Sequence, residues 1–198
     1  MPDDAVVLQL LAETPDLSGI LRELIDFDVE ELAYAGAFAA RLSSGESLQA
    51  IAVDGTGGRY FLVGAPAPAR RVLFATSEGS AGLVGPSLAG ALATMVAVPN
   101  WRDLLGFSGG GRLDEMRRAQ AWLADGEQRR HPDLGELQVA LATGLGLVLP
   151  DDPVFALWEA VSAADPDVDF IDDDDDEAAP WGSLFGAWTI ERLMPRSG

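Results

Sequence analysis

The sequence predicts an α+β fold in which helices come first, a small central antiparallel sheet follows, and further helices complete the chain. Three observations predict it. Apolar residues recur at helical spacing near the N-terminus, two apolar runs flank a glycine-rich turn at residues 54–58, and proline- and glycine-bounded helical patterns occupy residues 87–164. Because strand and helix patterns are segregated rather than alternating, a parallel α/β sheet is not expected.

The N-terminal helices are predicted from one apolar stripe and one capping pattern. Leucine and isoleucine recur at i, i+3, i+4, i+7 and i+8, at Leu17, Ile20, Leu21, Leu24 and Ile25. Asp28 is followed three residues later by Glu31, which is a capping-box spacing. This spacing predicts a second helix that runs through Leu42 and ends at Gly45.

The central sheet is predicted from three strand patterns in succession. The runs "SLQAIAV" and "RYFLVG" flank "DGTGG", whose Asp-Gly and Gly-Gly steps permit the positive φ that a hairpin turn needs. The run "RVLFAT" at 71–76 supplies a third strand. The turn "SEGSAG" at 77–82 then leads into a short strand, "LVG".

Helical patterns follow the sheet. One helix is expected between Pro86 and Pro99, a short one at "NWRDLLGF", and an amphipathic one from Leu113, with others after Pro132 and Pro153. We therefore expect a single α+β domain at residues 1–164, with the sheet core at about 48–85 and a helical second half at about 87–164. An acidic flexible segment at 165–179 and a C-terminal segment at 180–198 that docks on the body complete the expected organisation.

Three absences restrict the chemistry of the chain. It has no cysteine, which excludes thiol nucleophiles, disulfides and Cys-ligated metals. It has no lysine, which excludes a P-loop and Schiff-base catalysis. His131 is the single histidine, and its place before a helix start predicts a helix-capping or solvent-facing role. No cofactor, metal or catalytic residue is expected.

The charge balance predicts the kind of partner. The net charge is −19, and without the nine acids of residues 165–177 there remain 23 acids against 13 arginines, a balance of −10. Such a chain repels a phosphate backbone, so nucleic acid is excluded as a partner. A basic protein is the natural complement, and solubility is the alternative reason for the acidity.

The sequence shows no secretory signal, because acids stand where a basic N-terminal region belongs. The uncharged stretch from Ala81 to Trp101 is interrupted by glycines and prolines, which favours a buried turn and helix over a membrane span. We therefore expect a cytoplasmic protein that does not insert into a membrane.

The acidic run resembles a calcium loop only in part. Asp165, Asp167 and Asp169 match the first alternating ligand positions, but Phe170 stands where the loop requires glycine. A mobile tether is the preferred interpretation. It leaves a partner-docking role open, carried by Asp172, Asp173, Asp174, Asp175, Asp176 and Glu177 together with Trp181.

Two glycine-rich turns are candidate sites. "VDGTGGRY" lies between strands and lacks the spacing of a phosphate-binding loop, so it is interpreted as a hairpin turn. Glu78 in "SEGSAG" is the one carboxylate of its turn. A carboxylate-dependent hydrolase would need Glu78 to meet Asp54 or Asp103 in space, which the spacing alone does not bring about.

Three segments together resemble a known family. "IAVDGTGGRYFLVG", "RVLFATSEGSAGLVGPSL" and "VPNWRDLL" are similar to the core of the SUKH superfamily, which includes bacterial immunity proteins and cell-wall regulators. The similarity covers about residues 48–105. It implies an α+β fold, a protein that binds and blocks a toxin, and no catalytic residues. By this resemblance, seven residues are expected to be scaffold or groove positions: Asp54, Gly57, Gly58, Ser77, Glu78, Gly79 and Trp101.

The leading hypothesis is therefore a non-enzymatic immunity protein or antitoxin that neutralises a basic toxin, such as a nuclease, by covering its active site. The alternatives are the carboxylate-dependent hydrolase and a regulatory scaffold protein with a different partner.

Overall fold

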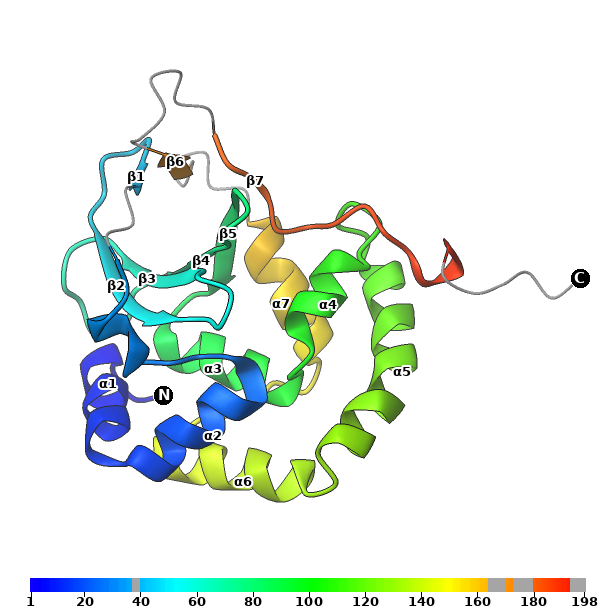
Figure 1. Ribbon diagram of the computed structural model, residues 1–198, viewed down its shortest axis with the longest axis horizontal. Coiled ribbons are helices and arrows are strands. Elements are labelled where there is room, and N and C mark those ends of the chain that lie inside the picture. Colours follow the sequence, from blue (N-terminus) through cyan, green and yellow to red (C-terminus); the bar gives the residue numbers. More distant parts are fainter. Residues whose placement is uncertain (37–39, 164–169, 173–179, 193–198) are drawn as a thin grey trace, which may run out of the picture.

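The computed structural model describes residues 1–36, 40–163, 170–172 and 180–192 (Figure 1). Its helices are α1 (Asp4–Glu13), α2 (Pro15–Ile25), α3 (Leu88–Ala97), α4 (Trp101–Gly106), α5 (Leu113–Arg130), α6 (Leu134–Leu145) and α7 (Pro153–Ser162), with short 3-10 turns η1 (Glu31–Ala33) and η3 (Ile190–Arg192). Its strands are β1 (Ala40–Leu42), β2 (Leu48–Val53), β3 (Arg59–Val63), β4 (Val72–Ala75), β5 (Ser80–Gly85), β6 (Phe170–Asp172) and β7 (Gly182–Ser183). The predicted α+β class is confirmed.

The main sheet has the strand order β2-β3-β4-β5-β7. The first four strands form the antiparallel meander that the sequence predicts, while β7 pairs with β5 in parallel. β1 and β6 form a separate two-stranded antiparallel sheet, in which Ala40 stands opposite Asp172. Residues far apart in the sequence are thus joined at the edges of the meander.

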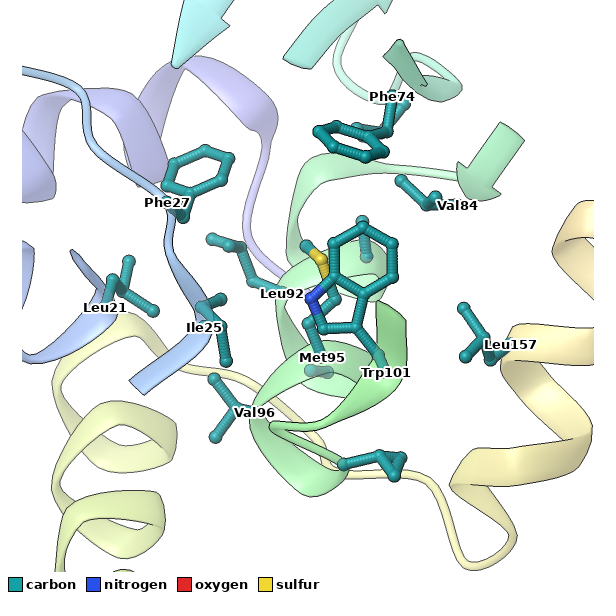
Figure 2. Close-up of a cluster of buried hydrophobic side chains, with 14 of the residues drawn as sticks. Leu21, Ile25, Phe27, Phe74, Val84, Leu92, Met95, Val96, Trp101 and Leu157 are labelled. Carbon is teal, nitrogen blue, oxygen red and sulfur yellow. The ribbon is translucent and has the colours of Figure 1, made fainter. Parts of the chain in front are cut away.

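The helical core covers one face of the sheet. Helix α3 is the centre of this layer and contacts α1, α2, α6, α7 and β5 (Figure 1). Ser87 caps it by accepting a hydrogen bond from the backbone N–H of Gly90 at 3.0 Å. Figure 2 shows Trp101 at the middle of the core, beside Phe74 and Met95. The ring of Trp101 is fully buried and meets that of Phe74 edge-on at 5.2 Å.

A smaller apolar cluster covers the other face of the sheet. Phe61, Leu73 and Leu83 project from the strands, Leu42 joins them from β1, and the partly buried Trp181 packs against them from the C-terminal segment. Strand β3 is consequently buried along its whole length. The apolar runs of the sequence therefore supply both faces of a sheet that is covered on each side.

The predicted helix from Asp28 to Gly45 is wrong. The Asp28 carboxylate does accept hydrogen bonds from the backbone of Glu30 and Glu31, at 2.9 and 3.0 Å, but only the 3-10 turn η1 follows. Both backbone groups of Asp28 bond to Val53 on β2. This pairing, together with the burial of Leu42 against the sheet, makes the segment an edge of the β layer instead of a helix.

The C-terminal residues 180–192 lie along the body in Figure 1. Gly186 donates to the carbonyl of Leu105 and accepts from Gly110, while Ile190 is 5% exposed. Within the residues that the structure describes, no helix has the length and apolarity needed to cross a bilayer.

Candidate functional site

The glycine-rich turn between β2 and β3 is organised by Asp54. Its Oδ1 accepts hydrogen bonds from the backbone N–H groups of Thr56, at 3.0 Å, and Gly58, at 2.7 Å, and the Thr56 hydroxyl donates to the same carboxylate. Gly57 has φ +93°, which L side chains avoid, and a Cβ on Gly58 would lie 3.0 Å from the carbonyl oxygen of Ala75. The turn is therefore a hairpin closed by its own aspartate, as expected.

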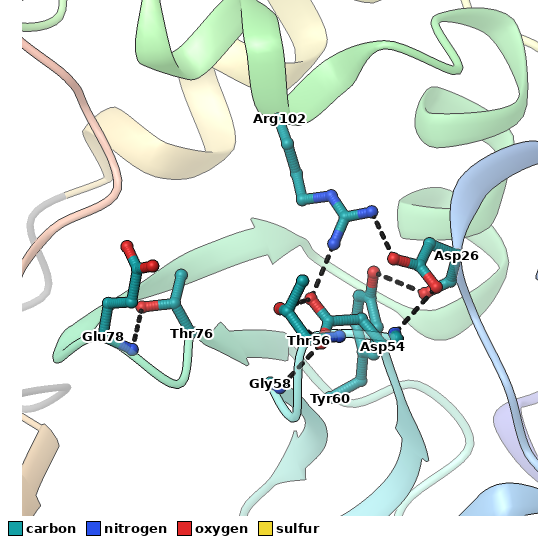
Figure 3. Close-up of polar contacts among 9 residues, drawn as sticks. Asp26, Asp54, Thr56, Gly58, Tyr60, Thr76, Glu78 and Arg102 are labelled. Atoms are coloured by element: carbon teal, nitrogen blue, oxygen red, sulfur yellow. Dashed lines mark hydrogen bonds and ion pairs between the residues drawn. The ribbon is translucent and has the colours of Figure 1, made fainter.

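Arg102 connects this turn to the helical layer. From α4 its guanidinium bonds to Asp54 Oδ2 and to Asp26 Oδ2, each at 2.6 Å (Figure 3). Asp26 lies at the C-terminus of α2 in the left-handed conformation, with φ 58°, and its Oδ1 accepts from the backbone of Gly55 at 2.8 Å. We call Asp26, Asp54 and Arg102 the ion cluster. It links α2, the hairpin turn and α4.

The surroundings of the ion cluster favour its charged form. Burial works against the charge of Arg102, but the hydrogen bond to Asp26 and the charges of both aspartates outweigh it and raise the arginine's pKa. Tyr60 lies beneath the cluster and donates its hydroxyl to the carbonyl of Asp26 at 3.4 Å. Burial raises the pKa of Tyr60 far above its ordinary range. This tyrosine therefore stays neutral.

The three segments that resemble the SUKH core meet at this point. Arg102 contacts Asp54, and a Cβ on Gly57 would lie 3.8 Å from the Cβ of Ser77 in the next turn. Trp101 packs in the core against Tyr60 and Phe74, and the guanidinium carbon of Arg102 lies 5.7 Å from the centroid of its ring. The short motifs thus describe one structural junction.

Glu78 lies apart from the ion cluster. Its turn is closed by Thr76, whose hydroxyl oxygen accepts from the backbone of Glu78 and Ser80, and Gly79 has φ +87°. Figure 3 shows the carboxylate of Glu78 pointing away from Asp54. Asp103 is exposed on α4, and Asp54 is engaged with Arg102. The arrangement does not favour the hydrolase alternative.

A polar cavity of about 370 Å³ adjoins the ion cluster. It lies between the C-terminal half of α2, the start of α4 and the end of α5, and it is bordered by Asp26 and Arg102. Asn100 lines it and is only 8% exposed, yet neither amide atom of its side chain has a hydrogen-bond partner among the residues that the structure describes. A buried amide without partners is rare in folded proteins.

His131 also lines this cavity. It ends α5 and is 9% exposed, so the solvent-facing alternative for it is wrong. Its Nε2 lies 3.6 Å from Oε1 of Glu127, one turn earlier, and the second oxygen of Glu127 lies 3.3 Å from Arg130. The capping alternative fits better, because the backbone carbonyl of His131 accepts from Leu134 at the start of α6.

The acidic segment is described only in part. Asp172 lies in β6, opposite Ala40 of β1, while Asp173 to Glu177 lie outside the described residues. Trp181 packs on the outer face of the sheet. No group of three or more His, Asp or Glu side chains suited to a metal ion occurs in the described part of the chain.

Three residues of the site were missed by sequence reasoning. Arg102 carried one signal, since it is the only basic residue between Arg71 and Arg112. Asp26 and Asn100 carried none, because nothing in their local sequence shows that α2 and α4 approach the same turn.

Comparisons of the chain with family models, with curated proteins and with solved structures find no match.

Proposed function

We propose that this protein is a non-enzymatic, cytoplasmic binding protein that covers the functional surface of a basic protein. Its most concrete form is a SUKH-like immunity protein that blocks a toxin by occlusion. The fold, the ion cluster and the charge distribution each support a part of this proposal.

The observation that carries the proposal is how the arginines are used. At least eight of the thirteen form ion pairs with carboxylates of the same chain: Arg22, Arg70, Arg71, Arg102, Arg112, Arg117, Arg118 and Arg130. With a net charge of −19, this internal pairing leaves a surplus of carboxylates, and exposed ones such as Glu23, Glu31 and Asp103 form no ion pair within the described residues. Such a surface attracts a cationic partner over a distance and speeds the encounter.

An acidic edge offers a place for such a partner. It comprises residues 23–34 and carries Glu23, Asp26, Asp28, Glu30 and Glu31. The edge ends at Tyr34, whose side chain is 84% exposed. Large exposed aromatics are enriched where proteins bind one another, and a tyrosine ring among carboxylates suits an arginine- or lysine-rich surface. We expect this edge to contact the partner.

The immunity role rests on the resemblance of residues 48–105 to the SUKH core. The residues that carry it, among them Asp54, Gly58 and Trp101, hold the structure together through the ion cluster and the core. By this proposal they supply the scaffold, and the acidic edge supplies the contact. The carboxylates of the edge would occupy the positions that substrate phosphates take in a nuclease.

Co-expression with a toxin encoded beside the gene tests the proposal. We expect this protein to restore growth and to bind the toxin in calorimetry, with a dissociation constant that rises steeply between low and high salt. Glu31→Lys and Tyr34→Ala should each weaken binding about tenfold. The matched control Glu136→Lys changes an exposed carboxylate on α6, outside residues 23–34, and should weaken binding less.

Two results would count against the proposal in different ways. Neither rescue nor binding would overturn the immunity role. Binding of a basic protein that is no toxin, with the same salt dependence and the same sensitivity to Glu31→Lys, would support a regulatory scaffold in its place.

A further inference from the structure

The polar cavity beside the ion cluster is built from three separate parts of the chain. Helix α2 contributes Glu23 and Asp26, the start of α4 contributes Asn100 and Asp103, and the end of α5 contributes His131. At about 370 Å³ it has room for a long side chain or a small molecule. Nothing in the sequence pattern marks this place, since its residues come from segments with no common motif.

The arginines at the rim are already matched by carboxylates. Arg102 bonds to Asp26 and Asp54 at 2.6 Å. Arg130 lies 3.3 Å from Glu127. Arg22, the third, lies 3.6 Å from Asp28 and 3.8 Å from Glu30. Their positive charge is therefore largely cancelled from within the chain, and they leave little attraction for an anionic ligand.

Two carboxylates of the cavity remain without an ion pair in the described part of the chain. Glu23 and Asp103 are both exposed and both line the cavity, on α2 and α4. Asn100 adds a buried amide whose oxygen accepts no hydrogen bond within the described residues, and a turn of its side chain toward the cavity would offer that oxygen to a ligand. A cation with several N–H groups is the ligand that complements two carboxylates and a neutral acceptor placed on different elements.

We propose that this cavity is a socket for an arginine side chain of the basic partner. The guanidinium is planar and carries five N–H donors, so it can serve acceptors spread over α2 and α4 at the same time. A lysine ammonium is more compact and more strongly hydrated, which suits such a spread set of acceptors less well. The socket lies at the start of the acidic edge, because Glu23 and Asp26 belong to both. The inference rests on the proposed function and adds the residue type that the protein selects.

The test uses three small probes of the full chain. N-acetyl-arginine amide, N-acetyl-lysine amide and N-acetyl-citrulline amide are titrated separately and followed through the backbone NMR signals of Asn100, Asp103 and Glu23. Citrulline keeps the shape of arginine and loses the charge. We expect arginine to bind with a dissociation constant on the order of 1 mM, lysine to bind more weakly, and citrulline to bind at least about tenfold more weakly than arginine.

The variants locate the binding. The double variant Glu23→Gln with Asp103→Asn should weaken arginine binding about tenfold or more. The matched control, Asp125→Asn with Glu136→Gln, removes the same two charges at exposed positions that do not line the cavity and should change binding by less than about twofold. Equal binding of citrulline and arginine, or equal loss in the two double variants, would overturn the socket.

The same variants separate the socket from the proposed function. If the toxin or other basic partner binds wild type and the cavity double variant equally well, the socket is wrong and the proposed function stands. If the partner does not bind at all while N-acetyl-arginine amide binds in the cavity, the proposed function fails and the arginine site stands.

Discussion

The ion cluster and the polar cavity are neighbours that share Asp26 and Arg102, yet they are built in opposite ways. In the ion cluster the carboxylate of Asp54 is 1% exposed and accepts bonds from a guanidinium, a hydroxyl and two backbone groups. In the cavity the amide of Asn100 is almost as deeply buried and has no partner in the described structure. Asp54 is satisfied by its neighbours, whereas Asn100 has no partner within the described residues.

This difference separates buried polar groups that stabilise the fold from a buried polar group that lacks a partner. A satisfied buried network fixes the fold, because removing any member leaves the others unpaired. An unsatisfied buried amide costs stability, and by our proposal the guanidinium of a partner completes that of Asn100. Asp54, which lies in a motif of the sequence, belongs to the first kind, and Asn100 belongs to the second.

Asp54→Ala is expected to have the largest effect. It removes the partner of Arg102 and the acceptor of the hairpin turn, and we expect the free energy of unfolding to fall by about 3 kcal/mol. Urea denaturation followed by circular dichroism measures this. Asp103→Ala, one residue from Arg102 but exposed and outside the cluster, is the control and should cost less than about 0.5 kcal/mol. An equal loss of unfolding free energy in the two variants would mean that the ion cluster does not stabilise the fold.

Much of the fold could be predicted because its signals are local. Pro86 and Pro99 enclose α3 as expected, and the glycines after Asp54 form the expected hairpin. The segment after Asp28 was mispredicted because its capping pattern is real but its outcome is decided by Val53, which lies on another element. A local pattern starts a turn, and pairing at a distance decides whether a helix continues.

The candidate site was less predictable for the same reason. Asp54 was identified through its turn, but its partners Arg102 and Asp26 come from α4 and α2, and only folding brings them together. The position of Asn100 in the lining of the cavity has no sequence signature. Residues that act through long-range contacts are visible in a single sequence only when their type is rare, as with the lone arginine between Arg71 and Arg112.

Asn100→Leu tests the cavity in the same way, by removing its unsatisfied amide. Because no hydrogen bond within the described structure is lost and an unsatisfied amide is removed, we expect the free energy of unfolding to rise by about 1.5 kcal/mol. Thermal unfolding should show an increased Tm, while binding of N-acetyl-arginine amide weakens. A loss of stability like that of Asp54→Ala would show that Asn100 is structural and that the two regions do not differ.

Asp152→Ala extends the comparison to a carboxylate at the surface. Like Asp54, Asp152 accepts a backbone N–H, from Phe155 at 3.0 Å, and pairs with an arginine, Arg117 at 2.7 Å. It caps α7, and we expect its loss to cost about 1 kcal/mol at neutral pH, less than Asp54 because water screens it.

The effect of Asp152 should depend on pH. The hydrogen bond from Phe155, followed by that from Arg117, holds its pKa below the ordinary 3.8. Its stabilisation is therefore complete above pH 3.8 and is lost as the pH falls through the lowered pKa of the folded state. Urea curves of wild type and variant should converge there. A difference that persists at lower pH would assign the effect to something other than the charged cap.

Glu78→Ala is expected to have the smallest effect, and it tests the division between fold and function most directly. Glu78 lies in a turn whose hydrogen bonds run through Thr76 and the backbone, so removing its exposed carboxylate should change the free energy of unfolding by less than about 0.5 kcal/mol. It also lies away from the ion cluster in Figure 3, so binding of the arginine probe should be unchanged. A marked loss of partner binding would instead place the contact surface over the turn at 77–82. Glu78 would then be a contact residue rather than a scaffold position, because an exposed carboxylate that does not stabilise the fold is free to bind an outside partner.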